Sequence, residues 1–539
     1  MEDLAHNSGV SPRLFQRFPR LIALGAGAIS ATGFAPLNLW PLALLCLALL
    51  LHSISTAHTL RRAFALGWLF GFGHFCLGNN WIATAFTYQA AMPAWLGWVA
   101  VGLLSLYLAI FPALASASAW WLWRKAGARW HGSSGATLTP FILIFAATWI
   151  ISEWLRSWLF TGFAWNPLGA LLVNHAALTA FIGSYGFSGA VCLSAGALLL
   201  LAHWRWKPAL LIAALLLLAH GAATFWLQES NPDASYMRGP LVTIVQPNID
   251  QGDKWDMAQR RANFAKLAAL SPRRPGTAPR LLLWPEAAVP DYLEGGYPLD
   301  WYVEPASFAR ARLASQLGAG DLLLTGAVKL EPNAANTDID GARNSLFVLN
   351  AAQQIQGRYD KAHLVPYGEY LPMRPLLSAI GLSRLTPGAV DFWPGPGART
   401  LDLRAQGFGK VGVQICYEMI FSGQVVDRAD RPDFIFNPSN DAWFGDWGPP
   451  QHLAQARLRA VEEGLPVVRS TPTGISAIID ADGRVVAQIA QHRAGRIDDH
   501  IPPAHRPTFF ATFGNMAPLG FAIALLVLAF LSRHRSALA

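Results

Sequence analysis

The chain has 539 residues, of which 53% are hydrophobic and only 14% are charged. A chain with so little charge cannot hide all of its apolar surface in one water-soluble core, so the composition excludes an ordinary soluble enzyme and favours a membrane protein. The formal net charge of +8 would suit a nucleic-acid-binding protein, but much of it falls in short clusters beside apolar segments. We attribute these clusters to membrane topology and expect no nucleic-acid partner.

Long apolar runs predict a multi-pass α-helical membrane bundle of about eight spans, because crossing the hydrocarbon core takes roughly 20 apolar residues. The first run could also be a cleaved signal peptide, with Arg13, Arg17 and Arg20 as its basic region. The later runs favour a true span. The predicted spans lie near residues 21–35, 38–56, 62–80, 94–116, 139–156, 176–202, 208–227 and 516–532.

Basic residues mark alternate connections between these runs, and connections 81–93 and 157–175 contain no Lys or Arg. Basic loops stay on the cytoplasmic side. The pattern therefore places both termini in the cytoplasm of a Gram-negative cell and the long connection before the last span in the periplasm. Arg156, which with Glu153 ends the fifth run, is the exception. Basic residues also precede the first run, and the other positions are Arg61, Arg62, Arg124, Lys125, Arg129, Arg205, Lys207, Arg533 and Arg535.

The chain accordingly divides into three parts. Residues 1–230 form a membrane domain with seven spans, residues 231–505 an inserted periplasmic domain, and residues 506–539 the eighth span with a short cytoplasmic tail. Within the inserted domain, β-rich runs alternate with helical patterns, which is typical of an α/β layered domain. Strands are expected at Leu241–Gln246, Leu281–Trp284, Leu322–Val328, Ser345–Leu349, Lys410–Ile415, Asp433–Asn437, Pro466–Arg469 and Ser476–Asp480, and helices at 256–270, 305–318 and 450–463.

Cys416 is the only cysteine of the inserted domain, so it has no disulfide partner there. A lone thiol in an oxidising compartment is open to oxidation without any structural benefit. The remaining cysteines lie in apolar runs, where a thiol behaves as a small hydrophobe. We therefore interpret Cys416 as functional, unlike Cys46, Cys76 and Cys192.

Three predicted strands lead into sequences that could carry chemistry. Glu286 stands in LLLWPEAAVP, Lys361 in RYDKAHLVPYGEYLP and Cys416 in GKVGVQICYEMIFSG. Singly, each has an ordinary explanation, because such a carboxylate is usually a cap and a loop lysine is usually exposed. Together they supply a thiol nucleophile, a carboxylate that takes and returns its proton, and a lysine that stabilises an oxyanion.

Other catalytic patterns are missing from the sequence. It contains no HExxH, CxxC, Walker A or GxGxxG motif, and neither His363 nor His452 is placed for a Cys–His pair. We therefore predict neither a metal ion nor a cofactor.

The three motifs, in this order, resemble those of the nitrilase (carbon–nitrogen hydrolase) superfamily. A nitrilase-like domain inserted before the last of eight spans is similar to the apolipoprotein N-acyltransferase family of Gram-negative bacteria. The resemblance covers essentially the whole chain and implies an α-β-β-α sandwich for the inserted domain. The matching local sequences are VQPNIDQGDKW (245–255), RNS (343–345), YDKAHLVPYGEYLP (359–372), CYE (416–418) and NPSNDAWFGDW (437–447).

The resemblance also implies residue roles. Glu286 matches the general base, Lys361 the oxyanion stabiliser and Cys416 the nucleophile that accepts the acyl chain. Glu369 is similar to the family's second carboxylate, which supports the lysine. Further positions that the family needs for activity, or that support its site, are matched by Trp255, Tyr417, Glu418 and Asn344.

The implied reaction has two steps and two lipid substrates. Cys416 attacks the sn-1 ester of a phospholipid, with phosphatidylethanolamine as the expected donor, and forms a thioester. The α-amino group of the diacylglyceryl-modified cysteine of an apolipoprotein then takes the acyl chain. The expected partners are thus phospholipid, diacylated apolipoprotein and the bilayer of the inner membrane, and we expect a monomer.

The segment 371–396 is apolar and flanked by Pro and Gly. We expect it to form a mobile lid or a membrane-dipping arm, alternatively to pack against the domain itself. The aromatic residues assigned to this arm are Phe392, Trp443, Phe444 and Trp447.

Two other functions remain open on the sequence. A membrane-tethered amidase would use the same triad but pass the acyl group to water. A transporter or receptor could carry the domain as an inactive sensor, although the spans contain few of the charges that mark transport paths, and the complete triad argues for activity.

Overall fold

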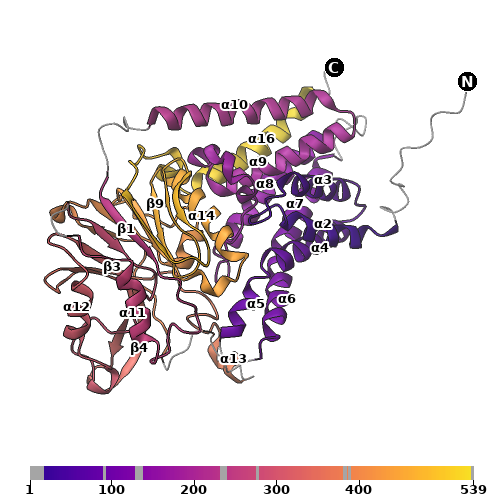
Figure 1. The fold of residues 1–539 in the computed structure, drawn as a ribbon. Helices are drawn as coiled ribbons and strands as arrows, with labels where there is room; N and C mark the ends of the chain where they lie inside the picture. The colour runs from indigo at the N-terminus through magenta and orange to yellow at the C-terminus, as the bar shows by residue number, and fades with distance from the viewer. Residues whose placement is uncertain are drawn as a thin grey trace, which may run out of the picture.

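The computed structural model describes residues 17–88, 93–127, 138–230, 239–274, 278–379, 385 and 390–535. A helical bundle and an α/β domain lie side by side (Figure 1). The bundle contains α2 (Pro19–Ala31), α3 (Trp40–Ser55), α4 (Leu60–Gly78), α5 (Ile82–Ala85), α6 (Leu96–Leu108), α7 (Ile110–Gly127), α8 (Leu138–Arg156), η2 (Leu168–Leu178), α9 (Thr179–Ala202), α10 (Trp206–Ser230) and, after the α/β domain, α15 (Phe509–Phe513) and α16 (Met516–Arg535). The basic positions Arg13 and Arg129 lie outside the described residues.

Each predicted span contains a helix, but the helices differ in length. Within the described ranges, four helical stretches are long and apolar enough to cross a membrane: Leu96–Lys125, Leu138–Arg156, Leu168–Ala202 and Trp206–Ser230. Shorter apolar helices occur at Pro19–Ala31, Trp40–Ser55 and Met516–Ser532.

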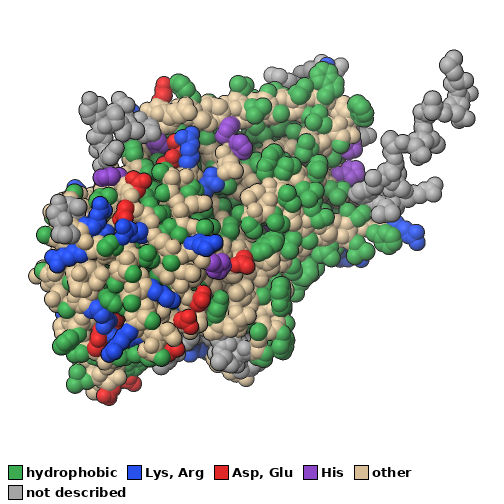
Figure 2. Space-filling view, viewed as in Figure 1, with side chains coloured by type: hydrophobic (Ala, Val, Ile, Leu, Met, Phe, Trp, Pro, Cys, Tyr) green, Lys and Arg blue, Asp and Glu red, His purple; other side chains and the backbone are tan. Residues whose placement is uncertain are grey.

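The surface of the bundle is apolar. Hydrophobic side chains spread over it, whereas Lys, Arg, Asp and Glu gather on the α/β domain (Figure 2). On α10, Leu217 and Leu218 are each 71% exposed. A continuous exposed apolar surface of this kind is typical of contact with lipid.

The α/β domain consists of two six-stranded sheets. The first has the order β12-β1-β2-β3-β4-β5 and the second the order β11-β10-β9-β8-β7-β6. The strands are β1 (Leu241–Gln246), β2 (Leu281–Leu283), β3 (Leu322–Pro332), β4 (Ile339–Asn350), β5 (Ile355–Asp360), β6 (Thr400–Asp402), β7 (Lys410–Val413), β8 (Phe434–Pro438), β9 (Val467–Ser470), β10 (Ser476–Ile479), β11 (Val485–Ile489) and β12 (Gly495–His500).

The sheets face each other, and helices cover their outer faces. Ile244 of β1 and Phe436 of β8 belong to one core between the sheets. The alternate residue Val245 packs outward with α11 (Arg260–Ala269) and α12 (Ala306–Ala314). Ile435 packs outward with α14 (Gly448–Glu463), which lies between the second sheet and the bundle (Figure 1). Side chains alternate across a strand, so both faces of each sheet are buried, and the domain is the four-layer sandwich expected for a nitrilase-like domain.

The α/β domain is joined to the bundle by buried charges of α14. α9 breaks at Gly183, which has φ +63°, so the N–H of Ser184 begins a new helical segment. The Glu462 carboxylate accepts from this N–H and from Ser422 Oγ (2.8 Å), and forms an ion pair with Arg459 at 2.6 Å. An anion at a helix N-terminus satisfies free N–H groups and the helix dipole. A residue of the α/β domain thus caps a helix of the bundle.

Replacing Glu462 with Ala should lower the free energy of unfolding by about 3–5 kcal/mol, because it leaves the buried Arg459 without its ion-pair partner. Denaturant titration of the full chain in detergent measures this change. The control is Asp446→Ala, since the Asp446 side chain is 83% exposed and its loss should cost about 1 kcal/mol or less. Equal effects of the two substitutions would contradict the capping role.

Candidate active site

The residues of the predicted triad lie at the carboxyl ends of strands. β2 pairs in parallel with β3, β4 is antiparallel to β3, and β5 is antiparallel to β4. β5 therefore runs in the same direction as β2, and their carboxyl ends share one edge of the sheet. Glu286 follows β2 there and Lys361 directly follows β5. Lys361 Nζ lies 3.5 Å from Glu286 Oε1.

Lys361 is fully buried between two carboxylates. Its Nζ lies 3.0 Å from Glu369 Oε2 in addition to its contact with Glu286. Asn344 Nδ2 donates to Glu286 Oε1 at 2.7 Å and to Glu369 Oε1 at 2.9 Å. Burial alone lowers the pKa of Lys361, but the charges of Glu369 and Glu286 outweigh it and raise that pKa above its usual value. The ammonium is therefore protonated at neutral pH and can stabilise a negative charge.

Cys416 follows β7 and begins the short helical turn η5 (Cys416–Ile420). Its φ is +52°, the left-handed region that a non-glycine residue occupies only when its surroundings require it. Burial, and then the charge of Glu286, raise the pKa of the Cys416 thiol, whereas Lys361 lowers it. The thiol is thus protonated at neutral pH, and a base must remove its proton during attack. Glu286 is the candidate for that base, because its charge acts on the Cys416 thiol.

Glu418 ties the Lys361 segment to the Cys416 turn. Its carboxylate accepts from the N–H of Ile415 (2.7 Å), immediately before Cys416. It also accepts from the N–H of Ala362 (2.7 Å), next to Lys361, from the N–H of His363 (3.1 Å), and from Tyr359 OH (2.8 Å). Burial raises the pKa of Glu418 to about 7 despite these donors. One side chain therefore joins the segment after Lys361 to the residue before Cys416.

A second buried network supports the backbone of the nucleophile. His452 Nε2 lies 3.1 Å from the Cys416 carbonyl oxygen, and its Nδ1 lies 3.0 Å from Asp441 Oδ1. Arg469 pairs with the same aspartate. His452 therefore hydrogen-bonds to the backbone of Cys416 and not to its thiol. The two residues do not form a Cys–His dyad. Sequence reasoning missed the support from His452, Asp441 and Arg469, although Asp441 lies within the motif NPSNDAWFGDW.

The bundle also contacts the catalytic turn. Tyr417 OH donates to the Gly162 carbonyl at 3.1 Å, in the loop that follows α8. His363 stacks on Phe421, with ring centroids 3.8 Å apart, and its Nε2 lies 3.4 Å from the Thr161 carbonyl of the same loop. The loop after α8 is therefore one wall of the site.

The aromatic residues assigned to a mobile arm take different places. Phe444 is 7% exposed and packs against Trp81 (4.7 Å) and Trp165 (5.3 Å) of the bundle. Phe444 is thus packed between the two parts of the chain, which favours the packed alternative over a mobile arm for this residue. Trp443 and Trp447 are half-buried.

The arm itself is only partly described. Residues 380–384 and 386–389 lie outside the described residues. At the start of the arm, Leu376 of α13 (Arg374–Ala379) is 63% exposed. Near its end, the Phe392 N–H donates to the Glu369 carbonyl at 3.4 Å, so this part is attached to the site. Trp255, expected at the site, is 39% exposed.

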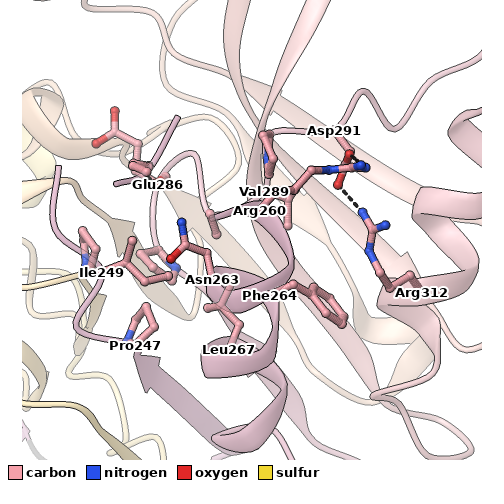
Figure 3. Close-up of a pocket in the computed structure, with 15 residues that line it drawn as sticks. Pro247, Ile249, Arg260, Asn263, Phe264, Leu267, Glu286, Val289, Asp291 and Arg312 are labelled. Carbon is pink, nitrogen blue, oxygen red and sulfur yellow. Dashed lines mark hydrogen bonds and ion pairs between the residues drawn. The ribbon is translucent and has the colours of Figure 1, made fainter. Parts of the chain in front are cut away.

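A pocket adjoins the candidate base. Glu286 lies at one end of it, and Arg260 and Arg312 hold Asp291 at the other (Figure 3). Cys416 does not line this pocket, so it borders the site without containing the nucleophile.

The two parts of the chain match two family models. The first is the apolipoprotein N-acyltransferase N-terminal domain, over residues 26–197, and the second is the carbon–nitrogen hydrolase model, over residues 241–504. Among solved structures, Nit3 of Saccharomyces cerevisiae, a member of branch 10 of the nitrilase superfamily, is similar with a TM-score of 0.35 and 23% identity, covering 49% of this chain and 91% of that one.

Curated relatives extend the match over both parts. The apolipoprotein N-acyltransferase of Rhodopseudomonas palustris is 34% identical over 534 residues, covering 96% of this chain and 95% of that protein. That of Bradyrhizobium diazoefficiens is 35% identical over 531 residues, covering 94% of each. The chain belongs to the apolipoprotein N-acyltransferase family. It is therefore an enzyme, an acyltransferase whose nitrilase-type domain is joined to a membrane bundle.

The raised pKa of Cys416 has a measurable consequence in this acyltransferase. Only the thiolate reacts with iodoacetamide, so alkylation of Cys416 should keep rising with pH above about pH 9, where an ordinary thiol levels off. Replacing Lys361 with Met removes the charge that lowers this pKa and should shift the profile to still higher pH. Peptide mass spectrometry of Cys416 measures the rate. A plateau below about pH 8 would mean that the thiol is already activated.

Glu418→Gln should slow acyl transfer by about a hundredfold, because an amide cannot accept all four hydrogen bonds and the two catalytic segments would shift apart. Tyr359→Phe is the matched control, since it removes one donor to the same carboxylate and should cost less than about tenfold. Rates are compared with saturating substrates in detergent. Similar losses in both variants would show that Glu418 does not position the segments.

Proposed function

We propose that this enzyme transfers a fatty acyl chain from the sn-1 position of a phospholipid, with phosphatidylethanolamine as donor, to the α-amino group of the diacylglyceryl-cysteine of apolipoproteins. The acyl chain passes through a thioester on Cys416. The observation that carries this proposal is the buried ammonium of Lys361, held by Glu286 and Glu369 beside a protonated thiol. Such a site supplies a nucleophile, its base and a cation for the oxyanion.

In the first step, Glu286 takes the proton of Cys416 as Sγ attacks the ester carbonyl. Lys361 stabilises the oxyanion of the tetrahedral intermediate. The C–O bond then breaks, and Glu286 returns the proton to the leaving alkoxide, which departs as lysophospholipid. The products are the Cys416 thioester and a deprotonated Glu286.

In the second step, the neutral α-amino group of the acceptor attacks the thioester carbonyl. Lys361 again stabilises the oxyanion, and Glu286 takes a proton from the attacking nitrogen. The C–S bond breaks, the amide is released, and Glu286 returns the proton to the Cys416 thiolate. The enzyme is thereby restored, and no water is consumed.

We further propose that the bundle crosses the inner membrane eight times. Residues 1–230 would hold seven spans, residues 231–505 the periplasmic catalytic domain, and residues 506–539 the last span, with both termini cytoplasmic. This topology is supported by the contact of the loop after α8 with the Cys416 turn, through Tyr417 and Gly162. A site beside the bundle lets the acyl chain stay out of water, which would cost about 10 kcal/mol for a chain of roughly 16 carbons.

The test is intact mass of the purified enzyme after incubation with phosphatidylethanolamine, for wild type and Cys416→Ala. We expect a hydroxylamine-sensitive adduct of one acyl chain on the wild type and none on the variant. Addition of a diacylated lipopeptide should discharge the adduct and yield a triacylated product. Release of lysophospholipid without an adduct, or discharge by water alone at the same rate, would instead indicate hydrolysis.

A further inference from the structure

A second lysine, Lys254, lies beside the site and has no role in the steps above. It stands on the loop between β1 and α11, within the motif QGDKW. Its Nζ donates to the carbonyl oxygen of Glu286 at 3.0 Å. In the amide orientation of Asn440 that satisfies the surrounding donors, with its side-chain O and N exchanged, the oxygen accepts from Lys254 Nζ at 3.2 Å and from Trp443 Nε1 at 3.0 Å. Two motifs that the triad does not use, around 254 and 440, therefore meet at this ammonium.

The two lysines of the site differ in their partners. Lys361 is held by two carboxylates. Lys254 instead donates to neutral oxygens, and none of the ion pairs formed by the described residues includes it. Burial lowers the pKa of Lys254 to about 8, although Glu286 and Cys416 act to raise it. Lys254 is half-buried and has no ion-pair partner in direct contact among the described residues, so an arriving anion could form a charge-assisted hydrogen bond with it.

We infer that Lys254 binds the phosphodiester of the acyl donor. This inference rests on the proposed function. Lys254 and Glu286 both line the same pocket, so a group that enters the pocket can approach the Lys254 side chain next to the candidate base. In a glycerophospholipid only the glycerol carbons separate the sn-1 ester from the phosphate, so a donor whose ester reaches Cys416 carries its negative charge near this flank of the site.

The other charges of the reaction fit Lys254 less well. The oxyanion is already assigned to Lys361, so Lys254 is not needed to stabilise it. The diacylglyceryl-cysteine of the acceptor brings an amino group and no phosphate, so the charge of Lys254 would repel its protonated form. A lysine that binds phosphate therefore favours the phospholipid donor in the first step. The phosphate then leaves the site as part of the lysophospholipid product.

The experiment compares two donors that share the reacting ester. The dissociation constants of phosphatidylethanolamine and of a diacylglycerol with the same acyl chains are measured in detergent micelles. The protein is the full chain carrying Cys416→Ala, with and without Lys254→Gln. We expect Lys254→Gln to weaken binding of phosphatidylethanolamine by about tenfold or more, the loss of one charge-assisted hydrogen bond. Binding of diacylglycerol should change by less than about twofold. Lys254→Arg should retain most of the affinity, and Lys266→Gln, on the exposed face of α11, controls for net charge.

Equal losses for both donors would overturn the inference and make Lys254 a positioning residue for the Glu286 loop. Unchanged binding of both donors would overturn it as well. Because binding to the Cys416→Ala enzyme needs no acyl transfer, these outcomes are separate from failure of the proposed function, which is a missing adduct on the wild-type enzyme.

Discussion

The site depends on one buried charge. An ammonium taken out of water costs several kcal/mol unless close partners compensate it, and Lys361 meets this requirement with Glu286, Glu369 and the bridging amide of Asn344. These groups come from the ends of β2 and β5, from β4 and from the loop after Lys361. Their mutual attraction therefore fixes how these segments meet. The same carboxylates raise the pKa of Lys361 and so keep it protonated, while burial raises the pKa of the Cys416 thiol.

The nucleophile is held from two sides. Within the α/β domain, Glu418 and His452 bind the backbone around Cys416. From the bundle, Gly162 accepts the Tyr417 hydroxyl. The strained φ of Cys416 is maintained by contacts that belong to different domains. The bundle thus contacts the turn that contains Cys416 directly and is more than a separate membrane anchor.

Much of the fold could be predicted from the sequence, because the inner strands are continuous apolar runs. All eight expected strands exist, whereas β5, β6, β11 and β12 were missed. Three of these carry charged residues, as in GRIDDH of β12, and β5, β6, β11 and β12 occupy the edges of the sheets. Strands that are half-exposed lack the apolar run on which the prediction relied.

The site was predictable to the extent that its residues follow strands. Glu286 and Cys416 follow apolar runs that were expected as strands, whereas Lys361 follows β5, which was missed, and was recognised only by its motif RYDKAHLVPYGEYLP. Lys254 and His452 do not follow a strand in this way, since Lys254 is placed by its contact with Asn440, far along the chain, and His452 by its contacts with Asp441 and with the Cys416 carbonyl. The sequence left open whether Phe444 is mobile or packed, because its burial depends on Trp81 and Trp165, which no local pattern connects to it.

The break in α9 bears on how the protein is made. A Cβ at Gly183 would lie 2.3 Å from the ring of Phe510, and Asn515 donates to the carbonyl of Ser422 at 2.9 Å, just beyond the Cys416 turn. Phe510 and Asn515 are synthesised after the whole of the α/β domain, because both follow β12 in the chain. The turn at Cys416 therefore gains these contacts only when the segment that leads into α16 docks against the bundle and the α/β domain.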